Sequence, residues 1–158
     1  MIDKKIQGKK NREKGQRFEL AVRKDLEKRG WIVSKWHNNV EIVTSPNQDG
    51  LELIVPEETK CIQAKRKYNP FIKAFGFGAG FPDFICFKNW GKRMVIHNDE
   101  FYKGNAYVII FVEAKTNGYL SKVEKEKANW YLKNGYCSEF LIAKKGKKGV
   151  EYKTYEAN

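Results

Sequence analysis

The hydrophobic pattern near the N-terminus is that of an amphipathic helix. Apolar residues recur at a spacing of four within residues 16–29, and they are Phe18, Val22 and Leu26. This spacing places them on one helical face. Gly30 predicts the end of the helix. Residues 31–36 then alternate between apolar and polar side chains, which predicts a strand.

Short β-type runs separated by turn residues occupy the middle of the chain. Three of them precede residue 65, at 40–44, 51–55 and 60–64. Pro, Asn, Asp and Gly lie between the runs, so we expect small strands or a hairpin. Residues 65–81 read as a loop in which glycine alternates with phenylalanine.

The second half of the chain alternates apolar runs with polar segments. Residues 107–115 form the strongest strand pattern, and the consecutive apolar residues at its start predict burial on both faces. Ser121 is a suitable N-cap for a helix that ends near Gly135. The other predicted elements are a strand at 82–87, a polar excursion at 91–105, a helix at 120–133, and strands at 139–143 and 150–155.

This order of elements predicts an α/β (α+β) fold with a central mixed β-sheet flanked by helices. The length of 158 residues fits one domain. We assign residues 16–158 to that domain, with an inserted β segment around residues 40–80. Residues 1–15 lack the apolar pattern and are rich in lysine and arginine, so we expect a mobile basic arm there.

The charge balance narrows the choice of partner. The chain carries 31 Lys and Arg against 19 Asp and Glu, a net charge of +12. A polyanion such as DNA is the expected partner. The alternative explanation of the charge is a lysine-rich proteome, in which the surface of every protein is positively charged. The three cysteines lack metal-ligand spacing, and their odd number argues against a disulfide framework. With neither a membrane-spanning run nor a signal peptide in the sequence, we expect a cytoplasmic protein.

Two carboxylates and a lysine form the candidate reactive centre. Glu113 and Lys115 are two residues apart in the strongest strand, so they share a face while Ala114 turns away. Asp83 lies at the start of another strand and joins them if the two strands are neighbours. Converging carboxylates beside a lysine suit Mg²⁺, which can activate water at a phosphodiester. In isolation, such a Glu-x-Lys pair is more often a surface salt bridge.

These residues resemble the signature of the PD-(D/E)XK nuclease superfamily. The match consists of Pro82-Asp83 and of Glu113-Ala114-Lys115. The segment KGQRFELAVRKDLEKRGWIV is similar to the first helix of archaeal Holliday-junction resolvases. The segments GAGFPDFI and VEAKTNGYLS are similar to virus-type replication-repair nuclease domains.

The resemblance implies a restriction-endonuclease-like core and a Mg²⁺-dependent endonuclease acting on branched or structured DNA, in which Mn²⁺ can replace Mg²⁺. Asp83 and Glu113 would bind the metal together with the carbonyl of Ala114, and Lys115 would be the catalytic lysine. Glu19 would reach the metal cluster through water or at a second ion. Resolvases act as two-fold dimers, so a homodimer is also expected.

One departure from the family pattern leaves the substrate open. Where the virus-type family has a glutamine on the helix after Glu-x-Lys, this chain has Glu124, and three nearby lysines are possible substitutes: Lys122, Lys125 and Lys127. The expected DNA-contacting residues are Lys65, Arg66, Lys67, Lys73 and Lys122. The alternative functions are a non-catalytic basic nucleic-acid-binding protein and a restriction-type endonuclease that cuts duplex DNA.

Overall fold

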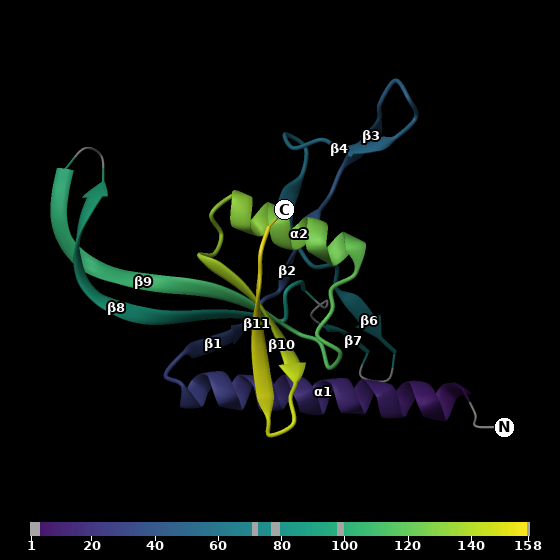
Figure 1. Cartoon of the computed structure of the whole chain (residues 1–158). Helices are drawn as coiled ribbons and strands as arrows, with labels where there is room; N and C mark the ends of the chain where they lie inside the picture. Colours follow the sequence, from purple (N-terminus) through teal and green to yellow (C-terminus); the bar gives the residue numbers. More distant parts are fainter. Residues whose placement is uncertain (1–3, 71–72, 77–79, 98–99, 158) are drawn as a thin grey trace.

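A computed structural model describes residues 4–70, 73–76, 80–97 and 100–157 (Figure 1). Its two helices are α1 (Lys4–Lys28) and α2 (Lys122–Lys133). The principal strands are β1 (Ile32–Lys35), β8 (Phe84–His97), β9 (Glu100–Ala114), β10 (Glu139–Lys145) and β11 (Val150–Tyr155). The shorter strands are β2 (Asn38–Glu41), β3 (Thr44–Pro46), β4 (Glu52–Ile54), β5 (Lys60–Gln63), β6 (Lys67–Asn69) and β7 (Ala74–Gly76).

A five-stranded mixed sheet forms the centre of the molecule. Its strand order is β1-β8-β9-β10-β11. Only β9 and β10 run parallel among the pairs of this sheet, and α2 provides the crossover between them. Figure 1 shows α1 on one side of the sheet and α2 on the other. The predicted fold class, a mixed sheet flanked by helices, is therefore confirmed.

Two hydrophobic clusters, one on each face of the sheet, hold the helices in place. Val22 and Leu26 of α1 pack with sheet residues that include Phe84 and Val112. On the opposite face, Tyr131 of α2 is fully buried against Phe111. Alternation along β9 thus buries both faces of this strand, as its apolar run predicted.

Helix α1 begins at Lys4 instead of at residue 16. Residues 4–15, which we expected to form a separate basic arm, are therefore helical. They lack an apolar stripe, but Lys, Arg, Gln and Glu all favour helix, and Glu13 pairs with Arg17 one turn later at 3.6 Å. The apolar pattern marks only the part of α1 that packs on the sheet.

Strands β8 and β9 form a long hairpin. The polar residues 91–105, which we predicted to be an excursion between strands, instead extend both strands in antiparallel register at 91–97 and 100–105, the part of this segment that the structure describes. The ladder is interrupted once, between Asn89 and Gly91, so that Trp90 is a bulge residue. Beyond this point the hairpin projects from the sheet as a two-stranded arm (Figure 1). Polar side chains are compatible with strands here because neither α1 nor α2 covers the arm.

Within the residues that the structure describes, the inserted segment contains three two-stranded pieces: β2 with β5, β3 with β4, and β6 with β7. The first four strands lie within or beside the three predicted β runs. The last pair corrects our prediction of a loop over residues 65–81 where the structure describes it, and residues 71–72 and 77–79 of that loop lie outside the described residues. The rings of the tyrosine and phenylalanine at the centres of these two strands are tilted against each other, with their centroids 5.2 Å apart.

Candidate active site

The backbone between the inserted segment and β8 places Asp83 beside the end of β9. A Cβ at Gly80 would lie 2.1 Å from the carbonyl oxygen of Trp36, so only glycine permits this close approach. After this contact the chain enters β8, where Phe84 pairs with Val112. Asp83 is therefore opposite Glu113, which confirms the neighbouring strands that our prediction required.

Asp83 and Glu113 lock together through reciprocal hydrogen bonds. The backbone N–H of Asp83 donates to Oε2 of Glu113 at 2.9 Å. In return, the backbone N–H of Ala114 donates to Oδ2 of Asp83 at 3.0 Å. The two carboxylates consequently have fixed positions, and the other oxygen of each is directed toward a lysine.

Lys115 connects the strand end to α2. Its Nζ lies 3.0 Å from Oε1 of Glu113, which confirms that these two side chains share one face. The same Nζ lies 2.6 Å from Oε1 of Glu124. Glu124 also completes a capping box with Ser121, so the predicted N-cap of this helix is confirmed and its start is tied to the lysine.

Glu19 reaches the cluster through a residue that the sequence analysis missed. Nζ of Lys35, on β1, lies 2.5 Å from Oε2 of Glu19 and 3.3 Å from Oδ1 of Asp83. The aliphatic part of Lys35 passes the ring of Phe84, with Nζ 4.7 Å from the centroid. Lys35 lies in a short strand outside any motif. Its pairing across from Phe84, next to Asp83, is visible only once β1 is known to pair with β8.

Burial and charge act strongly on these groups. Burial raises the pKa of Glu113 to about 8, and the charge of Asp83 adds to the effect while Lys115 opposes it. Partial burial alone would lower the pKa of Lys115, but the hydrogen bond to Glu124 and the charge of Glu113 outweigh it and raise that pKa. The pKa of Lys35 is raised in the same way, since Glu19 and Asp83 outweigh its desolvation. Both lysines are therefore held as cations.

The raised pKa of Glu113 predicts that the metal-free protein loses stability as the pH rises. Between about pH 4.5 and 8 the unfolded chain has lost the Glu113 proton while the folded chain retains it, so the free energy of unfolding falls across this window. We expect a loss of roughly 1–4 kcal/mol, measured by urea unfolding in EDTA from pH 5 to 8. Glu113→Gln should remove this part of the slope. Equal slopes for the variant and the wild type would contradict the prediction.

The donor chemistry at this position fits Mg²⁺. Among the described residues, no three acidic, histidine or cysteine side chains come together as a complete metal-binding group. Mg²⁺, however, usually keeps several waters and takes only one or two carboxylates from a protein. Asp83 and Glu113 supply two, and the ammonium of Lys35 already lies against Asp83 and Glu19, so the site attracts a cation.

The residues predicted to contact DNA do not all gather at this cluster. Lys65 is exposed between β5 and β6, and Lys73 is exposed just before β7 with a positive φ of 47°. Arg66 follows Lys65 directly. Lys67 begins β6, and its side chain lies outside the described part of the structure. These four positions lie along the inserted segment, at β6 and the residues beside it.

Helix α2 separates the lysines that were possible substitutes for the missing glutamine. Lys122 is exposed on its first residue, and Lys125 is exposed as well. Nζ of Lys127 instead donates to Oδ1 of Asn39 at 2.8 Å. Glu124 itself occupies the place beside Lys115, so this position holds an acid that contacts the predicted catalytic lysine.

Comparison of the chain with protein families, with curated proteins and with solved structures finds no match in any of the three. In the described part of the chain, neither helix is both long and apolar enough to cross a membrane.

Proposed function

We propose that this protein is a Mg²⁺-dependent nuclease that hydrolyses phosphodiester bonds of DNA, with a restriction-endonuclease-like core. The observation that carries the proposal is the reciprocal locking of Asp83 and Glu113 at adjacent strand ends, with Lys115 at hydrogen-bond distance. Asp83, Glu113 and Lys115 lie together here, and they are the three residues that the Pro-Asp and Glu-x-Lys patterns select from the sequence. The sheet that holds them is mixed and lies between two helices, which agrees with the proposed core.

Each residue has a distinct role in the proposed site. Asp83 and Glu113 would hold Mg²⁺, together with the carbonyl of Ala114, and the bound ion supplies an activated water and charge stabilisation at phosphorus. Lys115, held as a cation, orients the attacking water and neutralises charge that develops on the phosphoryl oxygens. Lys35 is a positioning residue because it holds Glu19 beside Asp83.

The charge of the chain supports DNA as the substrate. A net charge of +12 favours a polyanion. Lys65, Arg66, Lys67, Lys73 and Lys122 would contact phosphates on the surfaces that flank the site. The resolvase resemblance favours branched or structured DNA and a homodimer, in which two equivalent sites would cut two equivalent strands.

The proposal is tested by cleavage of a labelled substrate panel. We expect cleavage of a four-way junction in Mg²⁺ or Mn²⁺, slower cleavage of linear duplex of the same sequence, and none in EDTA, because the carboxylates need a divalent ion to act on a phosphodiester. Cleavage that persists in EDTA would contradict the proposed chemistry. Discrete fragments from duplex without preference for the junction would instead identify a restriction-type endonuclease.

One observation favours a second function, a basic nucleic-acid-binding protein without catalysis. Lys35 and Lys115 already pair with the carboxylates, which a purely structural ion-pair network would also do. The same panel separates the two functions. Binding of the junction without cleavage in any divalent ion would establish the second.

A further inference from the structure

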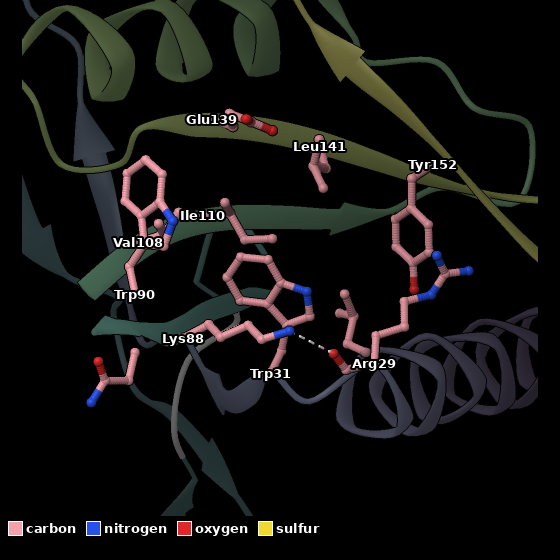
Figure 2. Close-up of a pocket in the computed structure, with 11 residues that line it drawn as sticks. Arg29, Trp31, Lys88, Trp90, Val108, Ile110, Glu139, Leu141 and Tyr152 are labelled. Carbon is pink, nitrogen blue, oxygen red and sulfur yellow. Dashed lines mark hydrogen bonds between the residues drawn. The ribbon is translucent and has the colours of Figure 1, made fainter. Parts of the chain in front are cut away.

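Helix α1 does not cover the whole of the sheet face on which it packs (Figure 1). Helix α1 ends at Lys28, and the sheet continues past this point toward the β8–β9 arm. The uncovered part holds a pocket of about 490 Å³, a size typical of ligand sites. Its floor is apolar and consists of Val108, Ile110 and Leu141 (Figure 2).

Aromatic rings border this pocket, and each of them has a basic residue beside it. Arg29 lies 5.1 Å from the ring centroid of Tyr152, and Nζ of Lys88 lies 6.0 Å from that of Trp31. Arg93 lies 5.4 Å from the ring of Trp90. In Figure 2 the indole of Trp31 lies between Trp90 and Tyr152. Cations interleaved with aromatic rings are the surface that stacks bases and follows phosphates.

The exposure of Trp90 is difficult to explain by packing alone. As the bulge residue it leaves the ladder of the hairpin, and its side chain is 66% exposed although it lines the pocket. Bulges commonly redirect a side chain toward a functional surface. Here the bulge places a large ring at the rim, where a ligand can reach one of its faces.

The polar groups at the pocket fit a nucleotide. Nζ of Lys88 donates to the backbone carbonyl of Arg29 at 3.1 Å. Because a carbonyl is neutral, this hydrogen bond leaves the positive charge of Lys88 uncompensated next to the rings. Asn89 and Glu139 also line the pocket. An amide and a carboxylate can accept hydrogen bonds from the N–H groups of a base edge, and the carboxylate disfavours a phosphate at the same spot.

We propose that this pocket binds unpaired nucleotides of a single-stranded DNA segment by stacking them on Trp90 and Trp31. In a duplex, the base faces are hidden within the stack, so a stacking pocket selects unpaired bases. Lys88, which lines the pocket, follows Asp83 by about five residues along β8, or roughly 17 Å at 3.3 Å per residue. The pocket is thus separate from the catalytic cluster. The inference rests on the proposed function because both require DNA, and it adds a preference for substrates with unpaired segments.

The test is the affinity of the full chain for DNA in EDTA, where no cleavage is expected. The probes are a fluorescein-labelled single strand of about ten nucleotides, within the usual site size, and the matching duplex. Trp90→Ala should weaken single-strand binding about tenfold, since loss of one stacked base has that effect, and should leave duplex binding unchanged. Trp90→Phe should retain most of the affinity.

Met94→Ala is the matched control. Met94 lies on the same arm with the same exposure of 66%, but it follows Arg93 and therefore points to the opposite face of the hairpin. It should bind both probes as the wild type does. Unchanged single-strand affinity in Trp90→Ala would overturn the inference, and so would an equal loss for both probes.

Two further outcomes keep this inference distinct from the proposed function and from self-association. A change in molar mass of Trp90→Ala by light scattering, with single-strand affinity unchanged, would show that the surface joins two copies of the chain and would overturn the inference. A tenfold loss in single-strand binding by Trp90→Ala, with no cleavage of any substrate by the wild type, would support the pocket and remove the nuclease proposal. Cleavage by the wild type, together with unchanged single-strand affinity in Trp90→Ala, would support the nuclease proposal and overturn the pocket inference.

Discussion

Asp83→Asn should reduce Mg²⁺-dependent cleavage by at least about a thousandfold, more than the roughly 10–100-fold cost of disturbing a partner of a metal ligand. The substitution preserves the size of the side chain and an oxygen that can accept from the N–H of Ala114. It removes the negative charge that the metal requires, and it places an amide where Lys35 now finds a carboxylate. Single-turnover cleavage of the junction measures the effect.

Asp49→Asn is the control for that substitution. Asp49 lies in the exposed turn between β3 and β4, where its backbone N–H donates to Asn47. The same change of charge there should not reduce cleavage. Junction binding in EDTA and the urea midpoint should be close to wild type for both variants. If Asp83→Asn retained more than about a tenth of the activity, Asp83 would not be a metal ligand.

Lys115→Met should lower kcat about 10²–10³-fold with little change in DNA affinity, which is the usual cost of removing one group that stabilises transition-state charge. The side chain lies between Glu113 and Glu124 as a cation, 3.0 Å from one and 2.6 Å from the other. Methionine retains the aliphatic length and removes the charge. Multiple-turnover kinetics with saturating Mg²⁺ separate kcat from KM.

Lys133→Met tests whether the loss of one positive charge is itself responsible. Lys133 is exposed in the last turn of α2, far along the helix from Glu124. Its loss should leave kcat unchanged. If Lys115→Met raised KM while kcat stayed constant, the lysine would stabilise the bound substrate and the transition state equally and would not contribute to the chemical step.

The sequence predicted which residues of the site lie together better than it predicted their surroundings. Glu113 and Lys115 follow from a period-two argument on one strongly apolar strand, and Asp83 needed only one further assumption, that the two strands are neighbours. Those are local patterns, so the backbone geometry of a strand suffices to place them. The N-cap at Ser121 is equally local.

Lys35 shows what a local pattern does not reveal. Its contacts with Glu19 and Asp83 join residues 16 and 48 positions away along the chain, and they depend on β1 pairing with β8 across the inserted segment. The β8–β9 arm was missed for a different reason. An alternation of apolar residues indicates burial. None of the arm's described side chains, at residues 91–94 and 103–105, is buried, so its polar residues resemble a loop.

The β3–β4 hairpin can change in length without changing the candidate active site. Its base is closed by the N–H of Val55 donating to the carbonyl of Val43 at 2.8 Å, and the strands beyond that bond are exposed. β1 pairs with β8 without any help from this hairpin. Extra residues at its tip would add little loop-closure entropy. The hairpin is therefore a suitable place to insert a tag or a fluorophore. Its length can also change while the carboxylates and lysines of the candidate active site keep their positions.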